Sequence, residues 1–239
     1  MARIAPGVIP SPNIWNTPQT YELENRAVDP EGVVDAAIAR VRDWAGGTVL
    51  DIGCGTGFHL PRYARTAATV IGVEPHGGLA RLAAERCRAA GDAGADVGEI
   101  TVRTGTAQAL PVPDSSVDVA VARWAYFFGP GCEAGLRELS RVVRRGGAAF
   151  VVDLDASRGS FGRWFTRSVP SYSASAVEGF WARQGWERRE LDLRMVFERR
   201  ADLEAVLRIE FTPEVAAWAI AETAGLEIGY PNILRWRLF

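Results

Sequence analysis

A short apolar strand that runs directly into a glycine-rich turn constrains this chain more than any other feature of its sequence. The run reads Val49-Leu50-Asp51-Ile52-Gly53-Cys54-Gly55-Thr56-Gly57. Glycines at this spacing let a strand turn sharply into a helix and let the backbone approach a ligand closely. The G-x-G-x-G spacing is tighter than the GxGxxG of dinucleotide sites, and an acid just before it suits an ammonium group better than a phosphate.

Strand-like and helical segments alternate on both sides of this turn. Short apolar strands are expected at residues 48–52, 69–74, 99–104, 117–123 and 147–154. Helical periodicity predicts helices from Pro30 to the Gly46-Gly47 pair and at residues 58–65, 78–90 and 133–143. Strands of this kind, joined by helical crossovers, predict a mostly parallel sheet with helices on both faces.

The pattern changes after Asp155. Residues 156–175 show no clean periodicity, and the later segments are predicted as helix 176–184, strand 189–198, helices 201–209 and 213–224, and strand 226–238. The predicted fold class is therefore α/β: a doubly wound, mostly parallel seven-stranded sheet with an antiparallel last strand. Residues 1 to about 30 are rich in Pro and Asn and are expected to form an irregular arm.

Composition and charge exclude several classes of protein. Of the 239 residues, 48% are hydrophobic, which is enough for a core without disulfides or metal. The net charge of −2 gives no basic field to attract nucleic acid. Cys54, Cys87 and Cys132 form no CxxC pair, so no metal site is expected. Without an apolar leader or a membrane-length run, a soluble cytoplasmic protein with no membrane partner is expected, its oligomeric state left open.

The run VLDIGCGTG closely resembles the motif that binds S-adenosylmethionine (SAM) in class I, Rossmann-like methyltransferases. The resemblance extends over residues 36–155 and implies a turn, here Gly53, Cys54, Gly55 and Gly57, that cradles the amino-acid end of SAM. It also implies that the acid at Asp51 holds the ammonium group of SAM.

The resemblance continues at the next strand end, in Ile71-Gly72-Val73-Glu74-Pro75. The acid matching Glu74 binds both ribose hydroxyls in that family, and Pro75 follows it in the site. A carboxylate can accept two hydrogen bonds from such a diol. We expect Glu74 to be exposed in the empty site, so that its removal leaves the stability of the ligand-free protein unchanged.

Two further segments resemble the family with departures. Gly105-Thr106-Ala107-Gln108 matches the segment that lines adenine, with Thr106 where Asp is usual. The backbone around Ala107 is expected to serve the ring, while Thr106 and Gln108 are either cofactor contacts or ordinary loop residues. Residues 136–147 match the family's helix-to-strand passage, with Arg145 in place of Pro.

The resemblance implies one methyltransferase domain over residues 1–239. It divides into an arm or lid (1–30), a SAM-binding core (36–155), a substrate-side insert (156–185) and C-terminal strands and helices (186–239). Tyr21 and nearby residues are expected to close over the methionine end of SAM. The alternative is that Trp15 and Tyr21 only pin the arm to the sheet edge.

The acceptor is expected at the carboxyl ends of the strands, where open parallel sheets bind ligands. Arg123 is predicted either to touch the methionine end of SAM or to pair with an acid. The aromatic side chains from Trp124 to Phe128 are expected to divide between pocket wall and core. Most aromatics of the insert are expected to pack in the core: Phe161, Trp164, Phe165 and Trp181. No catalytic base is assigned among His59, Tyr126, Asp153 and Asp155.

The resemblance thus implies a SAM-dependent methyltransferase that acts on an O, N or C atom of an unidentified small molecule. Nucleic acid is a disfavoured partner, because Arg123-Trp124-Ala125-Tyr126 stands where base-amino methyltransferases carry N-P-P-Y. Two alternatives stay open: a SAM-binding protein of this fold with other chemistry, and a tRNA or protein methyltransferase.

Overall fold

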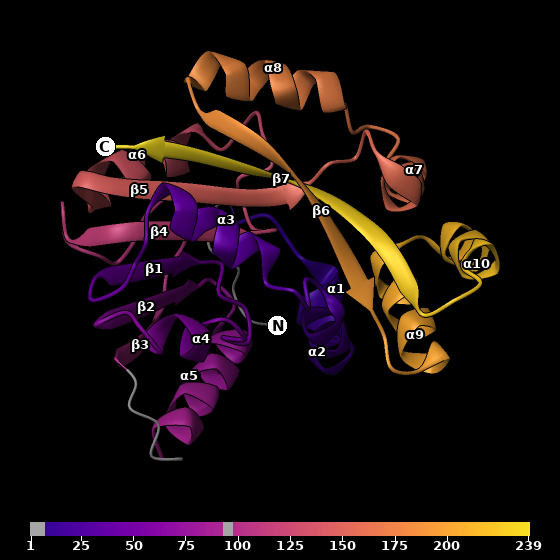
Figure 1. Cartoon of the computed structure of the whole chain (residues 1–239), viewed down its shortest axis with the longest axis horizontal. Helices are drawn as coiled ribbons and strands as arrows, with labels where there is room; N and C mark the ends of the chain where they lie inside the picture. The colour runs from indigo at the N-terminus through magenta and orange to yellow at the C-terminus, as the bar shows by residue number, and fades with distance from the viewer. Residues whose placement is uncertain (1–7, 93–97) are drawn as a thin grey trace.

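One seven-stranded sheet organises the computed structural model, which describes residues 8–92 and 98–239 (Figure 1). Its strand order is β3-β2-β1-β4-β5-β7-β6. The strands are β1 (Thr48–Ile52), β2 (Thr69–Glu74), β3 (Glu99–Thr104), β4 (Val117–Arg123), β5 (Val143–Leu154), β6 (Glu187–Val196) and β7 (Glu227–Leu238). The first five are parallel, and β7 runs antiparallel to both of its neighbours. The predicted fold class is confirmed.

Helices cover both faces of the sheet. The described helices are α1 (Pro12–Asn16), α2 (Pro18–Ala27), α3 (Val33–Val41), α4 (Leu60–Ala64), α5 (Gly77–Asp92), α6 (Glu133–Val142), α7 (Gly159–Ser168), α8 (Ala174–Gln184), α9 (Arg200–Glu210) and α10 (Pro213–Glu222). One apolar core joins the sheet to α3, α4, α7, α9 and α10, and a second joins the opposite face to α6 and α8. The central strand β4 is buried along its whole length, including its charged residues Asp118 and Arg123, as expected of a strand covered on both faces.

Two segments in which no helix was predicted contain helices. Residues 12–27 form α1 and α2, so an irregular arm is the wrong description of that part of the chain. Pro12 and Pro18 each stand in the first turn of a helix, where a missing N–H costs no internal hydrogen bond. The segment without clear periodicity, residues 156–175, contains α7, and the aromatic side chains Phe161 and Trp164 of this helix are buried.

Candidate cofactor and acceptor pocket

A pocket with about 1120 Å³ of empty space, taken out to its open mouth, lies at the carboxyl ends of β1, β2 and β4. Its walls come from the glycine turn, the end of β2, the loops at 105–108 and 124–128, and the helices α1 and α2. All of the cofactor residues predicted from the sequence line it except Gly57. This is the crevice in which open α/β sheets bind ligands.

The glycine turn owes its shape to backbone that only glycine adopts readily. Gly53 and Gly55 have φ angles of 75° and 56°, and both border the pocket. A Cβ atom on Gly55 would lie 2.8 Å from Cδ1 of Ile14 on α1. Gly57, also at positive φ, lies outside the pocket, and a Cβ there would come within 2.9 Å of Cβ of Ala83. The absence of a side chain at Gly57 therefore lets the turn pack against α5.

Glu74 is buried, which contradicts the expectation of an exposed side chain in the empty site. Only 4% of the residue is exposed. Its Oε2 accepts a hydrogen bond from the Gly55 amide at 3.0 Å, and its Oε1 accepts one from the His76 amide at 2.9 Å. Burial raises the pKa of the carboxyl group, and the two amide donors oppose that rise. Glu74 therefore joins the end of β2 to the glycine turn, and its removal has a structural cost.

Asp51 lies 3% exposed at the end of β1, on the floor of the pocket. Burial raises its pKa to about 7, an effect that the Arg123 guanidinium opposes and the Glu74 carboxyl group reinforces. A cation beside it would stabilise the ionised form and lower that pKa again. The position suits a bound ammonium group.

Arg123 pairs with an acid, the second of the two arrangements expected for it. Its Nη2 donates to Asp35 of α3, and its Nε donates to the Tyr63 hydroxyl at 2.9 Å. Arg62 forms a second ion pair with Asp35. The guanidinium group is thus held in place at the pocket wall by α3 and α4. The sequence alone did not predict that either helix contacts Arg123.

His59 lines the pocket with an unpaired ring nitrogen. Its Nδ1 is buried and has no hydrogen-bond partner among the described residues. Burial, followed by the positive charges of Arg123 and Arg62, lowers the pKa of the ring well below its usual value. The imidazole is therefore neutral at pH 7.

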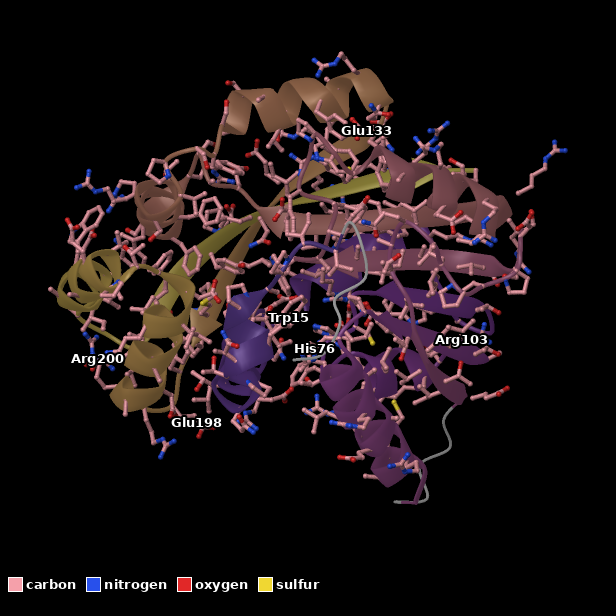
Figure 2. All side chains as sticks on the ribbon, turned by 180° about the vertical axis from the view of Figure 1, so that it is seen from behind. Trp15, His76, Arg103, Glu133, Glu198 and Arg200 are labelled. Carbon is pink, nitrogen blue, oxygen red and sulfur yellow. The ribbon has the colours of Figure 1, made fainter. Side chains whose placement is uncertain are left out.

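The helices of the arm cover the turn. Trp15 stacks on His76 with ring centroids 5.1 Å apart, and the two labelled rings lie side by side in Figure 2. Glu22 of α2 accepts hydrogen bonds from the Thr56 hydroxyl and from Arg86, the latter at 2.7 Å. Sequence reasoning missed Ile14, Trp15 and Asn25 as pocket residues, since helices were not expected there.

The chain just after α2 is bonded to a sheet edge, though not through Trp15 and Tyr21, the residues expected to pin it. Val28 forms an antiparallel bridge with Met195 of the edge strand β6, and the Asp29 amide donates to the Arg194 carbonyl at 3.0 Å. The pinning uses residues just beyond α2, while Trp15 and Tyr21 line the pocket.

The aromatic run after β4 divides between wall and core, as expected. Trp124, Tyr126 and Phe128 line the pocket, whereas Phe127 is buried in the core. Trp124 and Tyr126 have φ angles of 49° and 55°, a left-handed conformation that bulky residues rarely adopt. Such strain collects where the surrounding structure fixes a functional loop.

Side chains of the insert lie elsewhere. Phe161, Trp164 and Trp181 are buried in the two cores and Phe165 packs against one of them, which confirms their expected packing role. None of residues 156–185 is among the pocket's lining residues.

The other side chains considered as bases are engaged away from the pocket. Asp153 is buried, its Oδ1 accepts from the Leu154 amide at 2.8 Å, and the charge of Arg235 acts on it. Asp155 accepts from the amide and the hydroxyl of Ser157, at 3.1 and 2.6 Å. Neither lines the pocket.

In residues 8–92 and 98–239 no helix is long and apolar enough to cross a membrane.

Curated relatives match part of the chain. The uncharacterized methyltransferase YcgJ of Bacillus subtilis is 30% identical over 105 residues, which are 44% of this chain and 40% of YcgJ. The ubiquinone/menaquinone biosynthesis C-methyltransferase UbiE of Geobacter sulfurreducens is 29% identical over 125 residues, 51% of this chain and 47% of UbiE. The chain thus spans about half the length of the curated relatives it matches.

Solved structures show that the fold is shared more widely. The crystal structure of YcgJ superposes with a TM-score of 0.61 at 18% identity, covering 86% of this chain and 97% of that one. The [4+2]-cyclase SpnF gives a TM-score of 0.56 at 24% identity, covering 85% and 79%. Residues 50–151 match the family model of a methyltransferase domain, and they hold the glycine turn, Glu74 and the loop after β4. Residues 50–151 thus match a methyltransferase domain, and the chain has the fold of SAM-dependent methyltransferases of known structure.

Proposed function

We propose that the protein binds SAM in this pocket and transfers its methyl group to a small-molecule acceptor. The observation that carries the proposal is the pair of buried acids, Asp51 and Glu74, at neighbouring strand ends on either side of the Gly55 turn. Asp51 would hold the ammonium group, and Glu74 the ribose hydroxyls. The bare backbone of Gly53 and Gly55 leaves room for the ligand between them.

The chain's own contribution to the reaction is binding, orientation and exclusion of water. SAM, when bound, supplies an activated methyl group on a good leaving group, so no covalent catalysis by the protein is needed. Tyr21 and its neighbours on α2 cover the methionine end, and the loop at 124–128 fixes the opposite wall. An acceptor held in line in such a pocket reacts faster because orientation and desolvation are already provided. No base is assigned.

A small-molecule acceptor is supported by the curated relatives and by the pocket. UbiE is a C-methyltransferase of quinone biosynthesis, and a further relative from Aspergillus sclerotiorum is an O-methyltransferase. The pocket is partly covered by α1 and α2, which favours a ligand that enters it whole over a nucleic-acid strand or a protein surface. The likeness to a cyclase supports the alternative of other chemistry on the same fold.

Two measurements test the function. Titration calorimetry should show SAM or its demethylated product S-adenosylhomocysteine (SAH) binding at micromolar strength, about −8 kcal/mol. NAD serves as the matched control, and tighter binding of NAD than of SAH would refute the proposal. Methyl transfer from labelled SAM into compound pools then tests the reaction. Binding without transfer to any pool would favour other chemistry.

Hydrogen exchange tests the proposed lid. If α1 and α2 close over SAM, amides of residues 15–26 should gain protection when SAH binds. Amides of α10, which contributes no residue to the pocket lining, serve as the internal control. Equal exchange of residues 15–26 with and without SAH would show that the arm does not close over the ligand and only packs against the rest of the protein.

A further inference from the structure

The pocket has a second half beyond the two acids proposed to hold SAM, and Tyr21, which covers the methionine end, borders both halves. Asp51 and Glu74 stand at the ends of β1 and β2, so the cofactor extends along that side of the sheet. The remaining wall comes from α2 and from the loop after β4. We call its lining side chains the acceptor half: Tyr21, Asn25, Trp124, Tyr126 and Phe128.

The acceptor half carries no ionisable acid or cation among the residues that the structure describes. Three of its five side chains are aromatic rings from one loop, and Tyr21 adds a fourth ring. Val8, Ile9 and Pro10 extend the wall with further apolar groups. The nearby cation of Arg123 is already paired with Asp35. A charged acceptor would therefore lose its hydration without gaining a partner.

The aromatic wall is held rigid before any ligand arrives. The Trp124 indole Nε1 donates to Asn232 Oδ1 at 2.7 Å, and Asn232 is fully buried on β7. The Trp124 ring also packs against Tyr230, with centroids 5.9 Å apart. Together with the left-handed backbone at Trp124 and Tyr126, these contacts fix the orientation of the wall. A fixed aromatic surface favours a flat ligand that stacks on it.

Helix α2 offers the acceptor two polar groups. Tyr21 and Asn25 are four residues apart, so they share the helix face that lines the pocket. The side chains of both make no hydrogen bond to any described residue, which leaves the hydroxyl and the amide available.

Contacts on the other faces of α2 fix this orientation. Glu22 is tied to Thr56 and Arg86, and Glu24 is buried in a hydrogen bond with Glu210 of α9. Figure 1 shows α2 lying between the sheet and α9. The face with Tyr21 and Asn25 therefore cannot rotate away from the pocket without breaking both sets of contacts.

Resting on the proposed function, we infer that the acceptor is an uncharged, flat, ring-bearing molecule whose polar group is held by Asn25 and Tyr21 while its ring lies on the wall formed by Trp124 and Phe128. Its hydroxyl, amide or carbonyl group hydrogen bonds to α2, and its ring excludes water from the site.

Four matched naphthalene derivatives test this inference by calorimetry in saturating SAH. The neutral polar probe is 1-naphthol, the neutral apolar probe is naphthalene, and the charged probes are 1-naphthoate and 1-naphthylmethylammonium. We expect 1-naphthol to bind at least tenfold more tightly than either ion and severalfold more tightly than naphthalene. Equal or tighter binding of an ion would overturn the inference, as would the failure of all four to bind below millimolar concentration.

Variants locate the binding. Asn25→Leu keeps the side-chain size and should remove most of the advantage of 1-naphthol over naphthalene. Trp124→Leu should weaken both neutral probes at least tenfold. Trp218→Leu, an exposed tryptophan of α10 outside the pocket, is the control and should change neither. Unchanged probe affinities in both pocket variants would refute the placement.

The SAH affinity, measured first on the unmodified protein, separates the two proposals. If SAH does not bind, the proposed function fails. If SAH binds and the neutral probe has no advantage over the ions, only the acceptor inference fails.

Discussion

Lowering the pH should weaken cofactor binding through Asp51. Burial raises the pKa of this carboxyl group to about 7, so about half of the molecules carry it protonated at neutral pH. A bound ammonium group stabilises the ionised form and so lowers the raised pKa. Binding below pH 7 must therefore first remove a proton, and affinity falls as the pH falls.

The size of the effect follows from the ionised fraction. With a pKa of about 7, that fraction drops from about one half at pH 7.0 to about one tenth at pH 6.0, and the apparent affinity drops with it. The expected loss is about fivefold, or about 1 kcal/mol. The same raised pKa stabilises the empty protein at acid pH, and this contribution is lost as the pH rises through the folded-state value.

Calorimetric titration of SAH at pH 6.0, 6.5 and 7.0 measures this slope. Repeating each titration in two buffers of different ionisation enthalpy counts the protons released on binding. Asp51→Asn preserves the shape of the side chain, and its affinity should be lower and independent of pH over this range. A pH-independent affinity in the unmodified protein, or the same slope in Asp51→Asn, would refute the assignment of the ammonium site to Asp51.

Three further predictions follow from the same pocket. Gly55→Val should abolish SAH binding in a protein that still folds, because the new side chain strains the turn and meets α1. The control is Gly77→Ala, whose added Cβ meets no atom within 4 Å. Calorimetry measures SAH binding by both variants, and circular dichroism checks that both are folded. Glu74→Ala should lower the unfolding free energy of the ligand-free protein by about 1–3 kcal/mol, measured in urea, since the buried Gly55 amide and the partly buried His76 amide lose their acceptor. Burial and the neighbouring Glu210 raise the pKa of Glu24 well above its ordinary value, so that stability is lost as the pH rises through the raised value. Glu24→Gln should reduce the fall in Tm that the unmodified protein shows as the pH is raised from about 5 upward, and an unchanged fall would contradict this.

Local sequence was sufficient for the strands and for the central motif. The bounds predicted for β1, β2, β3 and β4 agree with the structure, because apolar runs between glycines and charged residues are signals contained within a few positions. The bounds of β5 were less accurate, since it begins at Val143, where the register with β4 shifts. A register irregularity depends on the partner strand and has no local signature.

The arm shows where local reasoning ends. Pro, Asn and polar residues indicated irregular chain, yet residues 12–27 form two helices because α2 packs on α9 and is tied to the glycine turn through Glu22. Short helices are marginal on their own and gain their stability from tertiary contacts. Those contacts join positions nearly two hundred residues apart, as in the hydrogen bond from Asn13 to Glu210 at 2.6 Å.

The candidate site divides in the same way. The sequence by itself was enough to place Asp51 and Glu74 at the ends of successive parallel strands, because short local motifs identify the strand ends and the glycine turn. Only the tertiary structure decided that Glu74 is buried against the turn and that Arg123 is held by Asp35. Burial and pairing depend on which distant segments cover a residue, and they set the pKa values and free side chains on which binding depends.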